Sequence, residues 1–146
     1  MNGPATVVSS SLFALEGASL ALPDLAQLDG GKTGGGYFLR ADGAGSQLLL
    51  PGVTNIAGIT AGFSTFEIAA LRGGTVELDH VEQLTTGGYA SFLADGLGSR
   101  LNLAAVKEVL GCTVEARNQG QIVWTDLNEA RFATLIKRDK ASLPSE

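Results

Sequence analysis

The chain has 146 residues, of which 45% are hydrophobic and 17% are charged, and its formal net charge is −5. So much apolar sequence argues against disorder, and the length suffices for one domain with a core of its own. A negatively charged body repels phosphate backbones, which argues against a nucleic-acid partner, and no run of ~18 apolar residues is present to span a membrane.

Residues 1–11 are expected to form an N-terminal edge segment, because they offer only Val7 and Val8 to cover the neighbouring part of the chain. The stretch "ATVV" is long enough for one short capping strand. The segment lacks the basic start and unbroken apolar run of a signal peptide. We therefore expect an open end in the fold, lined by the first apolar residues of the next segment: Leu12, Leu20, Leu22, Leu25 and Leu28.

Residues 12–125 contain an internal repeat. The stretch "ADGAGSQLLL" at 41–50 returns as "ADGLGSRLNL" at 94–103, and alignment on it reveals five copies whose equivalent positions lie 21 to 29 residues apart. Each copy has an apolar residue two positions before an alanine, then a glycine-bearing turn, then four apolar residues in a fixed spacing. Six columns of five residues result, and all thirty positions are apolar. The alanine column comprises Ala14, Ala41, Ala70, Ala94 and Ala116.

The spacing within each copy predicts short strands. Apolar residues at i and i+2 point to the same side of a strand, and the longer gaps that come after them mark corners. Repeats of this length are typical of single solenoid coils. The sequence thus predicts an all-β fold, a parallel β-solenoid of about five coils over 12–125, with the alanine column and Ala70 inside.

Residues 126–146 break the pattern. The stretch "TDLNEARFATLIKRDK" begins with the capping-box pair Asp126 and Glu129, its apolar residues fall near one face, and basic residues gather at its end. These features predict a C-terminal capping α-helix over 126–140, followed by a tail. Such a helix would cover the last coil, pack on Trp124, and block head-to-tail growth.

The turns in "ADGAGSQLLL" and "LRGGTVELDHVEQLT" resemble the coils of β-solenoid repeats in large bacterial surface proteins of the haemagglutinin and adhesin kind. The resemblance covers roughly residues 12–127. It implies a scaffold or surface role and an extracellular or cell-surface location. The chain differs from calcium-binding nonapeptide repeats, whose motif is absent, and from pectate-lyase-like enzymes, which have more coils.

Few motifs suggest chemistry, and none predicts a cofactor or a metal. The "GGKT" at 30–33 lacks both the upstream glycine and the following helix of a phosphate-binding loop, so an inter-coil loop is the better interpretation. Asp42 and Asp95 occupy equivalent positions two coils apart, which fits either ordinary turn chemistry or a weak alternative, a catalytic carboxylate pair. His80 fits a solvated corner, and Cys112 a small buried residue.

Aromatic residues on the longer connections form a candidate binding surface for a polysaccharide or protein partner if they point outward: Tyr37, Phe38, Phe63 and Tyr89. Inward packing is the alternative. We hypothesise a non-enzymatic structural or interaction module that self-associates through its open N-terminal edge as a two-fold homo-oligomer. The alternative function is a small carbohydrate-binding or carbohydrate-active β-helix.

Overall fold

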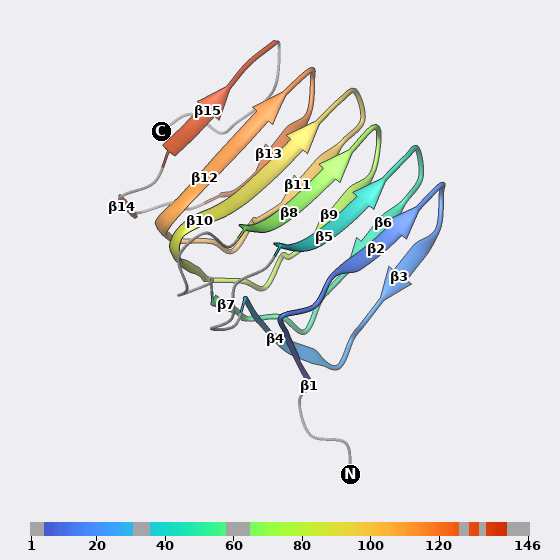
Figure 1. Cartoon of the computed structure of the whole chain (residues 1–146). Coiled ribbons are helices and arrows are strands. Elements are labelled where there is room, and N and C mark those ends of the chain that lie inside the picture. Colours follow the sequence, from blue (N-terminus) through green and yellow to red (C-terminus); the bar gives the residue numbers. More distant parts are fainter. Residues whose placement is uncertain (1–4, 31–35, 58–64, 126–128, 132–133, 140–146) are drawn as a thin grey trace.

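A computed structural model describes residues 5–30, 36–57, 65–125, 129–131 and 134–139. They form a parallel β-solenoid whose coils stack in a row from the N-terminal end to the C-terminal end (Figure 1). Strands far apart in sequence lie side by side because each coil pairs with the coils before and after it, and every strand pair is parallel. The predicted fold class is confirmed.

Three ladders of strands run along the solenoid. The first ladder contains β2 (Leu12–Leu15), β5 (Gly36–Asp42), β8 (Thr65–Leu71), β10 (Gln83–Asp95), β12 (Glu108–Arg117) and β15 (Thr134–Lys137). The second contains β3 (Ser19–Ala21), β6 (Gln47–Leu49), β9 (Thr75–Glu77), β11 (Arg100–Asn102) and β13 (Gln121–Val123). The third contains β1 (Ala5–Val8), β4 (Leu25–Asp29), β7 (Asn55–Ala57), the first parts of β10 and β12, and β14 (Glu129–Arg131).

The number of coils is close to the expected five. The second ladder has five strands, so the chain completes four turns between β3 and β13. Because β10 and β12 continue through a corner, they join the first and third ladders into one ten-stranded sheet.

The apolar columns form the core. Ala70 is 0% exposed, as predicted, and every described member of the six columns is buried except three half-buried residues of the first copy: Leu12, Leu20 and Leu22. A seventh column, which was not predicted from the sequence, aligns Tyr37, Phe66, Ala90 and Cys112 between neighbouring coils. Adjacent coils thus fill the interior jointly, and among the described residues the first coil has no neighbour before β2 and β3, while β13 of the fifth coil has none after it.

The turns between the first and second ladders alternate from coil to coil. The first, third and fifth coils use a tight turn in which the residue before the turn accepts a hydrogen bond from the residue three positions later. Both central residues have positive φ, as in a type I′ turn: Glu16 and Gly17, Arg72 and Gly73, and Asn118 and Gln119. The second and fourth coils use the longer "DGAGS" and "DGLGS" turns, with positive φ at both glycines. This alternation explains why the repeated decapeptide returns two coils later.

Each longer turn is hydrogen-bonded to the tight turn of the preceding coil. Ser46 and Ser99 are buried, and each hydroxyl accepts the backbone N–H of a glycine in the preceding coil, Gly17 or Gly73, at 2.9 Å. Each hydroxyl also donates to a carbonyl within its own turn. Serine is therefore the residue that joins one turn to the turn before it.

The predicted C-terminal helix is wrong for the described residues. Glu129–Arg131 and Thr134–Lys137 are strands β14 and β15, and both pair with β12. The local helix signals were overridden because the exposed edge of β12 offers a parallel ladder, and Leu135 packs against the core there. The rest of 126–140 lies outside the described residues, apart from Arg138 and Asp139, which continue from β15.

Candidate interaction surface

Asp42 and Asp95 do not face one another. Leu71 lies between them in the first ladder, so they are two strand spacings apart, ~10 Å. Asp42 accepts a hydrogen bond from the Arg72 guanidinium at 2.6 Å, and Asp95 accepts hydrogen bonds from Arg117 and Asn118 at 2.9 and 2.8 Å. Each carboxylate therefore links its coil to the next one.

The pKa values are consistent with these ion pairs. Partial burial by itself would raise the pKa of Asp95, but the hydrogen bonds from Asn118 and Arg117 and the charge of Arg117 bring it below its usual value. The hydrogen bond to Asp95 raises the pKa of Arg117, although partial burial opposes it. The charged forms of both groups are thus favoured in the folded chain.

The remaining candidates for chemistry occupy structural positions. His80 is exposed at a corner, with its Nδ1 3.1 Å from the Asp79 carboxylate. Cys112 is buried, and burial raises the pKa of its thiol to about 12.

Gly30, the first residue of "GGKT", donates its backbone N–H to the Ala57 carbonyl at 2.9 Å, while residues 31–33 lie outside the described residues. Trp124 is buried at the last coil.

The candidate aromatic surface is dispersed. Tyr37 faces inward in the seventh column and packs partly against the core. Phe38 is half-buried on the outer side, where the Arg40 guanidinium lies 4.4 Å from its ring centre. Phe63 and the side chain of Tyr89 lie outside the described residues. Binding of a polysaccharide here stays a prediction.

The N-terminal end is the surface where the core reaches solvent. The short strand β1 pairs with β4, as the sequence allowed for "ATVV", and Leu25 and Leu28 are buried there. β2 and β3 have no such cover among the described residues, because each is the last strand of its ladder. Their inward-facing leucines, Leu12 and Leu20, are accordingly only half-buried. We call the open edges of β1, β2 and β3 the N-terminal end.

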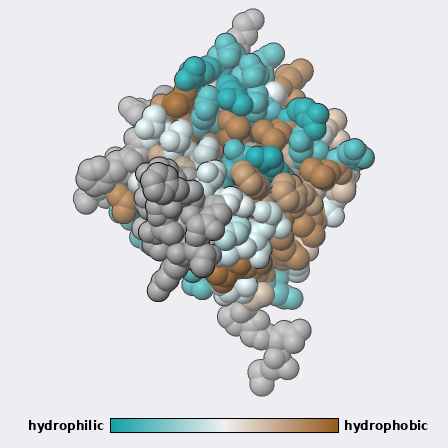
Figure 2. Space-filling view, in the orientation of Figure 1, coloured by the Kyte–Doolittle hydropathy of each residue, from teal (hydrophilic) through white to brown (hydrophobic). Residues whose placement is uncertain are grey.

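Large exposed apolar side chains gather at this end. Among the described residues, four large apolar side chains are exposed, and three of them lie on β1 and β2: Val8 at 49%, Phe13 at 46% and Leu15 at 48%. The fourth, Leu97, is at a turn of the fourth coil. In the space-filling view, hydrophobic atoms gather on the lower right, the side where Figure 1 places β2 and β3 (Figure 2). Phe13 and Leu15 are two residues apart on β2 and therefore point to the same side of it, as neighbouring side chains of an apolar interaction surface do.

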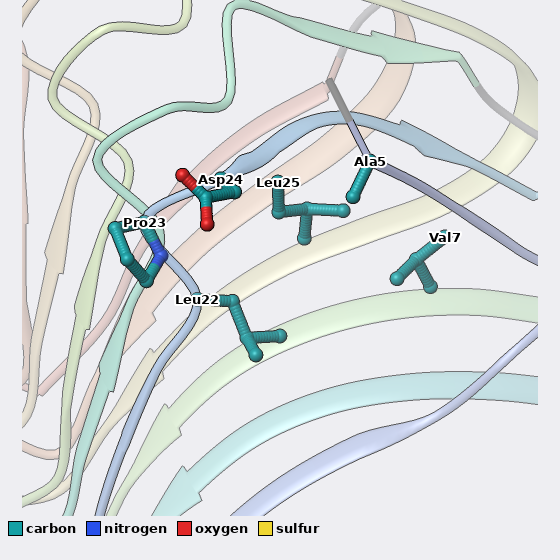
Figure 3. Close-up of a pocket in the computed structure, with 6 residues that line it drawn as sticks. All are labelled: Ala5, Val7, Leu22, Pro23, Asp24 and Leu25. Carbon is teal, nitrogen blue, oxygen red and sulfur yellow. The ribbon is translucent and has the colours of Figure 1, made fainter. Parts of the chain in front are cut away.

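A hollow of about 200 Å³ opens at the same end. It lies between β1 and the corner that precedes β4, and Figure 3 shows Val7, Leu22 and Leu25 around it. Its lining is apolar apart from Asp24, and Ala5 and Pro23 complete it. The volume of the hollow is large enough to admit an apolar side chain from a partner.

The fold and this end surface define the chain as a short parallel β-solenoid with an apolar N-terminal end. Comparisons with protein-family models, with curated proteins and with solved structures found no match. In the part of the chain that the structure describes, no helix is long and apolar enough to span a membrane, and no three His, Cys, Asp or Glu residues are grouped as metal ligands.

Proposed function

We propose that the chain is a structural assembly module that self-associates through its N-terminal end. The observation that carries the proposal is the concentration of exposed apolar residues Val8, Phe13 and Leu15 at the end where the core columns stop. β2 and β3 also present backbone N–H and C=O groups along an edge with no strand neighbour among the described residues. Such edges readily pair with another chain.

A second copy of the chain is the occupant that fits this end best. A two-fold related copy brings an identical apolar end and identical strand edges, so apolar atoms meet apolar atoms and edge strands can pair antiparallel. An exposed apolar side chain of one copy can then enter the hollow beside Val7 and Leu22 of the other copy. The adhesin-like context implied by the repeat is compatible with such assembly and stays an expectation.

The proposal is tested by measuring mass in solution by light scattering and sedimentation velocity across a wide range of protein concentration. We expect a monomer–dimer equilibrium in the wild type. Leu15→Lys should shift it to monomer, since a charge at the contact would have to be desolvated. Leu97→Lys is the matched control, because Leu97 is 74% exposed and lies on the fourth coil, away from the N-terminal end.

Circular dichroism of both variants establishes that they fold as the wild type does. A dimer that Leu15→Lys weakens and Leu97→Lys leaves intact supports the proposal. A wild type that is monomeric at every concentration refutes it, as does a dimer equally sensitive to both substitutions.

A further inference from the structure

At the C-terminal end, one position of the alanine column is occupied by a lysine, Lys137, instead of an alanine. Backbone hydrogen bonds from Arg138 to the Ala116 carbonyl and from Gln119 to the Asp139 carbonyl hold this segment against the fifth coil. β15 pairs with β12 in a register that aligns Leu135 with Val114 and Lys137 with Ala116. Lys137 therefore stands where the five preceding coils have alanine.

The alanine column is a narrow, dry part of the interior. Its five alanines are at most 1% exposed, and no larger side chain occupies the column in any coil from the first to the fifth. Lys137 is tolerated at the next level because β15 is the last strand of this ladder among the described residues and the Lys137 side chain is exposed.

Head-to-tail stacking of two copies would change this environment. If the first ladder continued in register, β15 of one copy would pair with β2 of the next, and Lys137 would align with Ala14. The ammonium group would then be enclosed between Ala116 and Ala14, among methyl groups that offer it no hydrogen-bond acceptor. Burial of an unpaired charge is strongly unfavourable, and inward-pointing charges are a known protection of strand edges.

We infer that Lys137 is an edge-blocking residue that prevents head-to-tail growth of the solenoid. The aligned N-terminal positions, Leu12, Ala14 and Leu20, carry no charge. With head-to-tail growth blocked, association through the N-terminal end stops at a closed two-fold contact. The restriction to a dimer rests on the proposed function, whereas the block at the C-terminal end stands independently of it.

The experiment compares the wild type with Lys137→Ala, which restores the residue found in the rest of the column. Sedimentation velocity and negative-stain electron microscopy would follow assembly over a wide concentration range. Lys137→Arg keeps the charge at the site. Lys107→Ala removes one charge from an exposed position on another coil and is the matched control.

We expect Lys137→Ala to form an open-ended series of oligomers or filaments whose mean mass rises at least several-fold with concentration, and both controls to keep the wild-type mass. Leu12→Lys, combined with Lys137→Ala, should abolish the growth, because Leu12 would align with Leu135 of the next copy in the same core column.

A Lys137→Ala protein that keeps the wild-type mass at all concentrations overturns the inference, and so does growth that Leu12→Lys leaves unchanged. A monomeric wild type would refute the proposed dimer alone, because Lys137→Ala would still grow head to tail if the block is real.

Discussion

Removal of the serine hydroxyl that connects neighbouring turns provides a direct test of the alternating coil structure. Ser99 is 1% exposed, and its Oγ accepts the Gly73 N–H at 2.9 Å while donating to the Asp95 carbonyl at 2.6 Å. Ser99→Ala deletes both bonds and leaves the Gly73 N–H facing a methyl group. No other change of volume or backbone conformation is required.

The expected cost follows from the buried N–H group. A hydrogen bond contributes only ~1 kcal/mol net, but a buried donor left without a partner costs about 1–3 kcal/mol. Since the Asp95 carbonyl loses a donor as well, we expect Ser99→Ala to lower the free energy of unfolding by about 2 kcal/mol. Ser46→Ala should have a similar effect, because Ser46 makes the same two contacts one coil pair earlier.

Urea denaturation, followed by far-ultraviolet circular dichroism and by fluorescence of Trp124, provides the measurement. Trp124 is the only tryptophan and is buried in the last coil, so its signal reports on that coil, whereas dichroism reports on the whole chain. Ser19→Ala is the control, because Ser19 is an exposed serine on β3. If Ser99→Ala costs no more than Ser19→Ala, the serine contacts do not hold the coils together and our explanation of the repeated decapeptide is wrong.

Two further predictions concern the core and the ion pairs. Ala70→Leu should overpack the alanine column and lower the free energy of unfolding, measured by urea denaturation, by about 1–3 kcal/mol. Ala21→Leu, on the exposed face of β3, should lower it far less. Similar decreases for the two variants would mean that the column is not tightly packed. Because the fold lowers the pKa of Asp95, its contribution to stability is present above the unfolded-state value of ~3.9 and is lost as pH falls through the folded-state value. Asp95→Asn should therefore be less stable than the wild type at pH 7, with the difference shrinking below about pH 4; a difference that is independent of pH would contradict this.

The sequence was sufficient to predict the solenoid because a coil's core depends on spacing that repeats. Each column needs an apolar residue at one position per coil, so alignment of Ala14 with Ala41, Ala70, Ala94 and Ala116 brings the other columns into register without a structure. The seventh column, Tyr37 to Cys112, was missed because its members differ in size and chemistry. Only the strand register places them together.

The C-terminal prediction failed for a related reason. A capping box and a basic end are local signals, whereas β15 forms because β12 presents a free edge nearby. Leu135 follows Val114 by 21 residues, which is within the repeat spacing, so extending the alignment by one more copy would have found this strand. The N-terminal end as an interaction surface stays a prediction, and of its expected lining residues Leu25 and Leu28 are buried. The exposure of Phe13 and Leu15 on its outer side could not be derived from inward-facing columns.

The alternation of turns makes a pair of coils, rather than one coil, the structural unit of this fold. A longer turn supplies the serine that satisfies the glycine N–H of the tight turn before it, as Ser99 does for Gly73. The same longer turn supplies an aspartate that binds the arginine of the tight turn after it, as Asp95 does for Arg117. Two tight turns in succession would leave the glycine N–H without its hydroxyl acceptor, and two longer turns would place their aspartates side by side with no arginine between them. The serine and aspartate contacts therefore repeat with a period of two coils, and the gain or loss of coils in pairs preserves them.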